Sequence, residues 1–295
     1  MTALNRDPDG ELAQGTLWEA TCAAVRRGLR TGALEPLTTR VAAVPEAGIP
    51  FSVRVLAGLE RKIERTREQR RAGRNPFLPH DPDLFVSGLS DSHRVVLNKY
   101  PVLDHHLLLV TRRFERQEAA LDRDDLDAAL RGLAEFPSLA FYNGGRAAGA
   151  SQRHKHLQLV ALPLGAHGED LPIEVAFRGA GHSPILPFRH AFAPVPAAWW
   201  HEPSRRDRAA EESLALYHEL LAATDSTTTG DPRPYNWLLS RRFMWVVPRS
   251  RGSWEGIPAN ALAYAGALFA RGEAQHERIR QAGPLRILRE AGHPW

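Results

Sequence analysis

The segment SQRHKHLQLV, at residues 151–160, decides how this chain folds. Side chains on a β-strand point alternately to the two faces of its sheet. As a strand, the segment places two imidazoles and an amide on one face, those of His154, His156 and Gln158. The leucines between them fall on the opposite face. We therefore predict a strand with one polar, reactive face and one face that packs in a core.

Small residues precede this strand and favour a turn that binds anions. The chain passes through FYNGG at residues 141–145, and five small residues follow one another closely: Gly144, Gly145, Ala147, Ala148 and Gly149. Backbone N–H groups can approach an anion where side chains are small. A His-x-His pair alone is more typical of a surface pair or of half a metal site. Its combination with an Asn-Gly-Gly turn and with Gln158 in register favours a histidine that acts on a phosphate-containing ligand.

The motifs YNGG at 142–145, GASQ at 149–152 and HKHLQ at 154–158 resemble the signature of a known family. This is the diadenosine tetraphosphate phosphorylase or ATP adenylyltransferase family, within the histidine-triad and galactose-1-phosphate uridylyltransferase superfamily. The resemblance continues in NPFLP at 75–79, VLNKY at 96–100, YNWLLS at 235–240 and VVPRS at 246–250. It covers roughly residues 50 to 290, and a match in several parts is more specific than any single motif.

Length and composition fit a globular enzyme. The chain has 295 residues, of which 43% are hydrophobic and 24% charged, so it can bury a substantial core. We find no apolar run long enough to span a bilayer and no signal-peptide core at the N-terminus. The single Cys22 excludes an internal disulfide and a multi-cysteine zinc site. A reducing, cytoplasmic setting is therefore expected.

The positive charge comes almost entirely from arginine. The net charge is +4, and of 38 basic residues three are lysines, Lys62, Lys99 and Lys155, while the other 35 are arginines. Two of the lysines lie inside the motifs, where a compact ammonium would suit a phosphate. The mild basicity fits a small polyanionic ligand. Without a dense basic patch with interleaved aromatic residues, neither a nucleic acid nor a membrane is expected as a partner.

The hydropathy pattern predicts an α+β fold. We expect helices at 10–33, 122–136 and 204–223, a charged, solvated helix at 59–71, and a long helix from Pro258 to Arg280. Strands are expected at 51–55, 94–99, 106–111, 139–142, 156–161, 235–240 and 243–247, with irregular connections at 36–50, 75–82 and 162–203. The result is a histidine-triad-like antiparallel sheet flanked by helices. Residues 1–165 would form the catalytic half, 166–203 a Pro-rich connection, and 204–295 a C-terminal half that adds strands and helices.

The resemblance implies roles for individual residues. His156 is the expected nucleophile, with Gln158 binding a phosphate oxygen. His154 either assists His156 or the leaving group, or makes a structural hydrogen bond. The implied substrate contacts are Lys62, Asn98, Lys99, Asn143, Ser151, Gln152, the backbone of Gly149 and Ala150, and Ser240, Arg242, Arg249 and Arg251. His93, His105 and His106 are expected to be structural.

The implied reaction is reversible conversion of diadenosine tetraphosphate and phosphate to ATP and ADP through a nucleotidyl-histidine. A neutral imidazole suits attack on an anionic phosphoric anhydride. A divalent cation, Mg²⁺, would arrive on the nucleotide, because no protein ligand set for it is visible. The expected partners are small molecules: the dinucleoside polyphosphate, ATP, ADP and phosphate. No oligomeric state follows from the sequence.

Four alternatives remain open. A sugar-1-phosphate nucleotidyltransferase would carry His-Pro-His-x-Gln and often zinc-binding cysteines, against which Lys155 and the lone Cys22 argue. A dinucleoside polyphosphate hydrolase would use water as the acceptor. A nucleotide sensor with an inactive site is opposed by the intact His156 and Gln158. A histidine-only zinc module lacks a third ligand.

Overall fold

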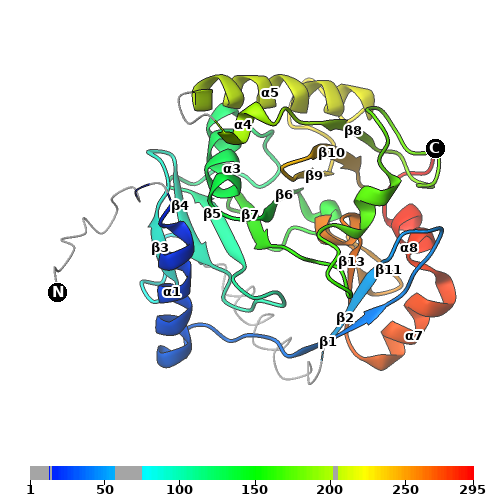
Figure 1. Ribbon diagram of the computed structural model, residues 1–295, viewed down its shortest axis with the longest axis horizontal. Helices are drawn as coiled ribbons and strands as arrows, with labels where there is room; N and C mark the ends of the chain where they lie inside the picture. The colour runs from blue at the N-terminus through cyan, green and yellow to red at the C-terminus, as the bar shows by residue number, and fades with distance from the viewer. Residues whose placement is uncertain (1–12, 14, 57–74, 202–204) are drawn as a thin grey trace.

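An eight-stranded antiparallel sheet forms the centre of the molecule (Figure 1). The structure is a computed structural model, and it describes residues 13, 15–56, 75–201 and 205–295. The strand order is β3-β4-β5-β7-β6-β9-β10-β8. The bounds are β3 Phe85–Gly88, β4 His93–Leu97, β5 Leu107–Thr111, β6 Ser138–Gly144, β7 His156–Ala161, β8 Ala191–Pro194, β9 Tyr235–Leu239 and β10 Phe243–Pro248.

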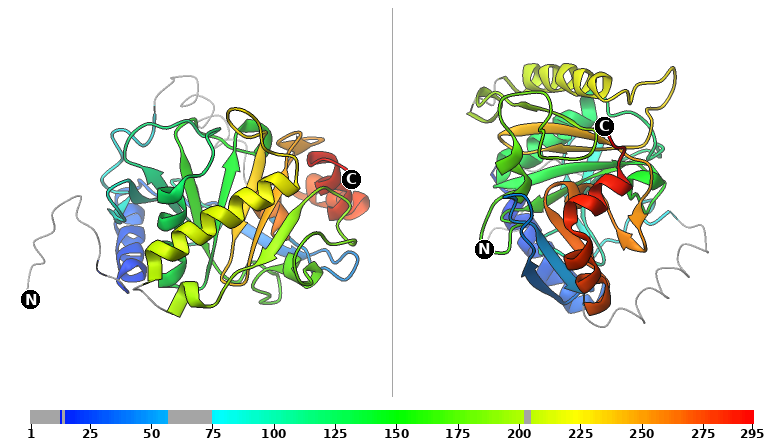
Figure 2. Two further views of the ribbon diagram at one scale, coloured as in Figure 1. Left: turned by 90° about the horizontal axis from the view of Figure 1, so that it is seen from above. Right: turned by 90° about the vertical axis from the view of Figure 1, so that its right-hand side faces the viewer.

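Three helices cover one face of this sheet, and the sequence explains why that face is largely apolar. The strand residues that point toward the helices include Leu157 and Leu159, which are fully buried as the alternation predicts. The covering helices are α1 Leu17–Thr31, α3 Arg123–Glu135 and α5 Arg206–Ala223, which Figure 2 shows in two further views. The short helix α4 Ala198–His201 precedes α5.

A smaller sheet and the C-terminal helices pack on the other face. The small sheet has the order β1-β2-β13, with bounds β1 Thr39–Ala43, β2 Ser52–Leu56 and β13 Ala267–Ala270. Around it lie α6 Ala261–Tyr264, α7 Glu273–Ala282, α8 Pro284–Ala291, the 3₁₀ turn η2 Pro172–Ala176 and the two-stranded pair β11 Ser253–Trp254 and β12 Ile257–Pro258. Since β13 pairs in parallel with β2, the C-terminal part of the chain closes onto its N-terminal part.

The predicted α+β class with an antiparallel sheet is confirmed. The predicted hairpin between β4 and β5 is present, with Val96 opposite Leu108. Helix α3 begins as predicted, because Asp122 accepts from the backbone N–H of Asp125 at 3.0 Å and Asp125 returns the contact in a capping box. The main sheet runs without a break from the first to the second half of the sequence through the pairing of β6 with β9.

The long helix expected from Pro258 to Arg280 is wrong. The segment instead contains β12, α6, β13 and the start of α7. Gly266, with φ +95°, ends α6, and Gly272, with φ +112°, precedes α7. The four residues of β13 are buried on both faces, and a continuous apolar run of this kind has no period that separates strand from helix.

Three other boundaries also differ from the expectation. The connection at 36–50 contains β1, and the one at 162–203 contains η2, β8 and α4. The first helix is shorter than expected, since it begins at Leu17 and ends at Thr31 with Gly32 as its left-handed C-cap. The charged segment expected at 59–71 lies outside the described residues.

Candidate active site

The expected reactive residues gather at one end of strands β6, β7 and β9, on the face opposite α1, α3 and α5. On this face His156 and Gln158 lie between two apolar clusters. One cluster contains Val160 and Phe141, and the other contains Val110 with the loop residue Phe77. Asn143 belongs to this face as well, and its strand β6 pairs with β7. His156, Gln158 and Asn143 form a polar row. This row is bounded by hydrocarbon on both sides, which lowers the local dielectric.

The ring of His156 has one nitrogen held and one nitrogen open. Its Nδ1 lies 2.8 Å from the carbonyl oxygen of His154, and a carbonyl can only accept. Nδ1 therefore carries the proton and Nε2 carries the lone pair. Among the described residues nothing bonds to Nε2, and this atom is not sealed from solvent. The ring of Phe77 packs 5.3 Å away, centroid to centroid.

Burial keeps this imidazole uncharged at neutral pH. The side chain is 4% exposed, and burial lowers the pKa of His156 to about 4 against the opposing effect of the hydrogen bond to His154. Desolvation disfavours the charged form of a histidine. The open nitrogen is thus a neutral nucleophile of the kind that attack on a polyphosphate requires.

Gln117 clamps the backbone of His156, and sequence reasoning missed it. Its Oε1 accepts from the His156 N–H at 2.9 Å, and its Nε2 donates to the carbonyls of His156 at 3.2 Å and Asn143 at 3.0 Å. Its own carbonyl accepts from the hydroxyl of Tyr142 at 2.5 Å. The partners are main-chain atoms or come from distant segments, so no local motif could have revealed this residue.

The His154 ring is engaged at both nitrogens. Its Nε2 donates toward the carbonyls of Thr111 at 2.9 Å and Arg113 at 3.0 Å, which leaves Nδ1 to accept from Asn75 Nδ2 at 2.9 Å. Burial lowers the pKa of His154. Of the described hydrogen bonds none joins the ring of His154 to His156; the contact is made by the His154 backbone carbonyl, which accepts from His156 Nδ1. Asn75 was missed as a contact, although it begins the motif NPFLP.

Gln158 is held by a histidine expected to be structural. Its Oε1 accepts from His106 Nε2 at 2.9 Å, and His106 Nδ1 accepts from Asn98 Nδ2 at 3.2 Å. Burial lowers the pKa of His106 to about 4, so this ring is also neutral. The structure places Asn98 behind His106, where its side chain supports Gln158. Lys99 lies beyond Asn98 with its ammonium over the Tyr100 ring at 5.6 Å.

Asn143 and Asn236 face each other across β6 and β9. Asn236 Nδ2 donates to Asn143 Oδ1 at 2.8 Å, and the backbone N–H of Ala261 donates to the same oxygen at 3.0 Å. Asn236 was missed as a site residue, although it lies in the motif YNWLLS. Its Oδ1 accepts from Arg249.

Arg249 is a buried support with no carboxylate partner among the described residues. It is 2% exposed, and its N–H groups donate to main-chain carbonyls, including those of Ala259 at 2.7 Å and Ala291 at 3.1 Å. The Tyr264 ring lies 4.6 Å from the guanidinium. Burial lowers the pKa of Arg249. The structure therefore places this predicted substrate contact beneath the turn, where it positions Asn236.

The glycine-rich turn is closed on itself. The N–H groups of Gly149 and Ala150 donate to the carbonyls of Arg146 and Gly145, at 3.0 and 3.1 Å, within and after the 3₁₀ turn η1 Arg146–Ala148. Gly149 has φ +97°, and a Cβ there would lie 2.8 Å from that of Asn260. Ser151 is exposed and Gln152 half-buried. Neither side chain has a hydrogen-bond partner within the described part of the chain, so both are open to a ligand.

Lys155 points away from the polar row, into the helix-covered face. Its side chain is 1% exposed, and its ammonium pairs with the Asp125 carboxylate and, at 3.2 Å, with Glu115. Asp125 also bonds His93 at 3.1 Å. Burial lowers the pKa of Lys155, but the charge and hydrogen bond of Asp125 together with the charges of Asp122 and Glu115 outweigh burial, so the pKa is raised overall. The suggestion that this lysine meets a phosphate is therefore wrong.

Ser240 and Arg242 lie at the far end of the sheet from His156. Ser240 donates to Glu174 Oε1 at 2.8 Å, and Arg242 pairs with the other oxygen of Glu174. Arg251 is exposed. It lies beside the glycine-rich turn, because a Cβ at the neighbouring Gly252 would be 3.0 Å from the carbonyl oxygen of Arg146. Lys62 lies outside the described residues.

No group of three His, Cys, Asp or Glu side chains that could hold a metal occurs in the described ranges. Nor does any helix of the described residues combine the length and apolar character needed to cross a membrane. The polar row itself offers imidazole and amide groups. The chemistry of a magnesium site, which prefers carboxylate oxygens, is not matched there.

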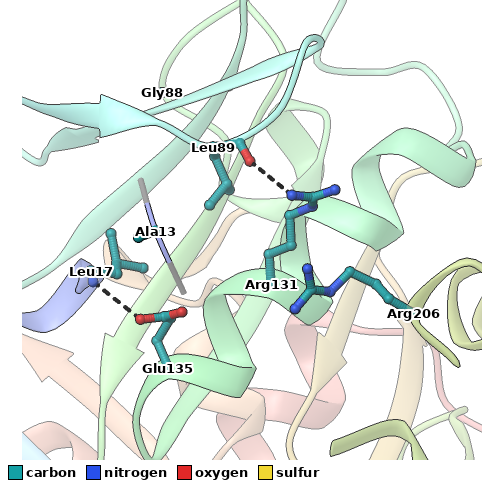
Figure 3. A pocket seen from close by; sticks show the side chains of 7 residues that line it. All are labelled: Ala13, Leu17, Gly88, Leu89, Arg131, Glu135 and Arg206. Atoms are coloured by element: carbon teal, nitrogen blue, oxygen red, sulfur yellow. Dashed lines mark hydrogen bonds between the residues drawn. The ribbon is translucent and has the colours of Figure 1, made fainter. Parts of the chain in front are cut away.

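A small pocket lies elsewhere, among α1, α3 and α5 (Figure 3). Its walls are Ala13, Leu17, Gly88, Leu89, Arg131, Glu135 and Arg206. Glu135 accepts from the Leu17 N–H at 3.1 Å, so it caps the start of α1. Because this pocket is on the helix-covered face, it is separate from His156.

Two family models together match nearly the whole chain. The model described as the Ap4A phosphorylase N-terminal domain matches residues 7–179, and the ATP adenylyltransferase C-terminal domain matches residues 184–294. Ap4A is diadenosine tetraphosphate.

Two similar proteins come from Saccharomyces cerevisiae. Diadenosine 5',5'''-P1,P4-tetraphosphate phosphorylase 2 is 27% identical over 290 residues, covering 85% of this chain and 86% of the relative. Protein APA1 is 25% identical over 277 residues, covering 85% of each. The crystal structure of yeast Ap4A phosphorylase Apa2 in complex with Ap4A has a TM-score of 0.77 at 22% identity, covering 96% of this chain and 99% of that one. This likeness establishes the fold.

Proposed function

The chain belongs to the family of Ap4A phosphorylases and ATP adenylyltransferases, and we infer from this membership and from its site that it is a nucleotidyltransferase that converts Ap4A and phosphate reversibly to ATP and ADP. The observation that carries this inference is the neutral His156 ring with its proton fixed on Nδ1 and its Nε2 open. An open imidazole nitrogen beside two amides can attack a phosphorus and stabilise the oxygens that surround it.

The proposed reaction has two displacements at one phosphorus. The Nε2 lone pair attacks an α-phosphorus of Ap4A, the bond from that phosphorus to the bridging oxygen breaks, and ATP leaves. Inorganic phosphate then attacks the same phosphorus, the P–N bond breaks, and ADP leaves with His156 restored. The carbonyl of His154 stabilises the Nδ1 proton while Nε2 carries the nucleotidyl group. The covalent intermediate thus divides one difficult transfer into two easier displacements.

Side-chain N–H groups would bind the phosphate oxygens. Gln158 and Asn143 have their amide oxygens occupied and their amide nitrogens without partners among the described residues. An amide donor can bind an oxygen anion without giving up a proton, so it stabilises the transferring group without competing for it. Removing one such donor commonly costs on the order of a hundredfold in rate. Ser151 and Gln152 are suitable for further contacts.

We propose that Mg²⁺ reaches the site on the polyphosphate. Bound there, it would neutralise negative charge on the phosphates. We expect EDTA to stop turnover, and equilibrium dialysis of the protein without nucleotide to find no tightly bound Mg²⁺. Stoichiometric Mg²⁺ on the free protein would contradict this proposal.

The nature of the acceptor tests the proposed function. The protein is incubated with Ap4A with and without phosphate, and the nucleotides are separated by chromatography. With phosphate we expect ATP and ADP in equal amounts over many turnovers, and without it no more than one equivalent of ATP per enzyme. We also expect the reverse synthesis of Ap4A from ATP and ADP. The variant His156→Ala serves as the inactive control. AMP and ATP formed with water alone would identify a hydrolase, and transfer only to a sugar phosphate would identify the other class of transferase.

A further inference from the structure

The orientation of the Gln158 amide is set by a chain of hydrogen bonds that begins at a main-chain N–H. The N–H of Tyr100 donates to Asn98 Oδ1 at 3.2 Å, and an N–H cannot accept. Asn98 therefore presents Nδ2 to His106 Nδ1 at 3.2 Å. The His106 proton must then lie on Nε2, which donates to Gln158 Oε1 at 2.9 Å. Each group in this chain is left with one available role.

A second chain of hydrogen bonds orients the Asn143 amide, and it too leaves the NH₂ group without a partner among the described residues. The guanidinium of Arg249, which can only donate, bonds Asn236 Oδ1. Asn236 Nδ2 therefore turns to Asn143 Oδ1 at 2.8 Å and also donates to the carbonyl of Ala148 at 2.9 Å. The main-chain N–H of Ala261 donates to the same Asn143 oxygen at 3.0 Å. Both ends of this chain are fixed by groups whose roles cannot reverse.

The two chains leave two NH₂ groups on the face that carries His156. Neither Gln158 Nε2 nor Asn143 Nδ2 has a partner within the described ranges, and neither atom is sealed from solvent. Gln158 follows His156 by two residues on β7. Phe141 pairs with Gln158, so Asn143 lies level with His156 on the neighbouring strand. The donors therefore flank the reactive nitrogen from two sides.

We propose that His106 and Asn236 are positioning residues that hold the amides of Gln158 and Asn143 with their NH₂ groups toward the reacting phosphate. The proposal rests on phosphoryl transfer at His156. A reversed amide would present an oxygen lone pair to an anionic phosphate, turning a stabilising contact into a repulsive one. Neither positioning residue needs to touch the substrate. Their effect passes through the amide that each one holds.

A double-mutant cycle tests the first chain. His106→Phe keeps an aromatic ring and removes the donor, and it is measured alone, with Gln158→Ala, and in combination. We expect His106→Phe to lower kcat about tenfold or more, and to change kcat by less than about twofold once Gln158 is already alanine. The matched control is His105→Asn, at the adjacent histidine, which lies near Cys22 and away from Gln158. It should leave kcat unchanged.

The second chain gives an independent variant. Asn236→Asp keeps a partner for Arg249 and loses the donor to Asn143. We expect it to lower kcat about tenfold or more, and to have little further effect in an Asn143→Ala background. Thermal melts of all variants establish that they are folded. Losses that multiply in the double variants, or full kcat in His106→Phe and Asn236→Asp, would overturn the proposal. The proposed function is tested separately: it requires that the wild-type protein phosphorolyses Ap4A and that His156→Ala abolishes this activity. The positioning proposal can therefore fail while the proposed function holds.

Discussion

His156 and its chain neighbour Lys155 face opposite environments. The imidazole and amide side chains described around His156 are uncharged, and its Nε2 has no partner among the described residues. The face with Lys155 carries a buried ammonium and carboxylate, closed under α3. A reacting anion meets neutral donors on the first face, while charge on the second fixes the strand to the helix. The comparison supports the proposal that neutral groups act on the substrate, while charge anchors the motif to α3.

The largest effect should come from the open nitrogen. His156→Ala should lower kcat on the order of a thousandfold or more, because the nucleophile is lost. His154→Ala should cost on the order of ten- to hundredfold, since its carbonyl remains and only the placement of that carbonyl loosens. Steady-state assays of Ap4A phosphorolysis measure both. Equal losses would give the His154 ring a chemical role and would break the contrast between the two rings.

The charged face should govern stability more than turnover. Lys155→Met leaves Asp125 buried without its cation, which typically costs about 3 to 5 kcal/mol of unfolding free energy. Urea unfolding measures this loss. The control is Lys99→Met, at a half-buried lysine whose ammonium lies over the half-buried Tyr100 ring, and it should have little effect. A normal stability for Lys155→Met combined with a raised KM for phosphate would instead place this lysine at the substrate.

The two faces should lose stability in different pH ranges. Burial lowers the pKa of His106 and His156 to about 4, whereas an unfolded histidine titrates near pH 6.5. Between these values the unfolded chain binds more protons, so stability is complete above about pH 6.5 and falls toward pH 4. The pKa of Asp125 is lowered: burial raises it, but the bonds to His93 and Lys155 outweigh burial, so its contribution is lost only in stronger acid.

Urea unfolding at pH 7, 5.5 and 4.5 measures this separation. The midpoint should fall steadily over this series, and His106→Phe should reduce the slope by about one proton. A midpoint that is independent of pH down to 4.5 would contradict neutral burial of these rings.

The smallest effects are expected at the far end of the sheet. Ser240→Ala should leave kcat and KM for Ap4A within about twofold and lower stability by about 1 kcal/mol, the usual worth of one hydrogen bond. Arg242→Ala, at an exposed guanidinium, should also leave kcat and KM nearly unchanged. A tenfold rise in KM for either variant would restore the role that the resemblance assigned to them.

Local patterns in the sequence were sufficient for some elements of this site. The alternation in HKHLQ predicts which side chains share a face, and Asp122 marks the start of α3, because both depend on residues close together in the chain. Gln117 and Asn236 depend on contacts between distant segments, so their roles emerge only in the folded chain. Arg249 was expected to contact the substrate, yet it is buried and donates to main-chain carbonyls.

In the proposed mechanism His156 carries the nucleotidyl group between the two displacements. Mixing the protein with Ap4A and Mg²⁺ without phosphate, quenching in base and measuring the intact mass tests it directly. We expect one added adenylyl group, stable in base and lost in acid, located on His156 by peptide mapping and discharged as ADP when phosphate is added. A protein that remains unmodified but still forms ATP and ADP when phosphate is added, or an adenylyl group on another residue, would show that His156 is not the nucleophile.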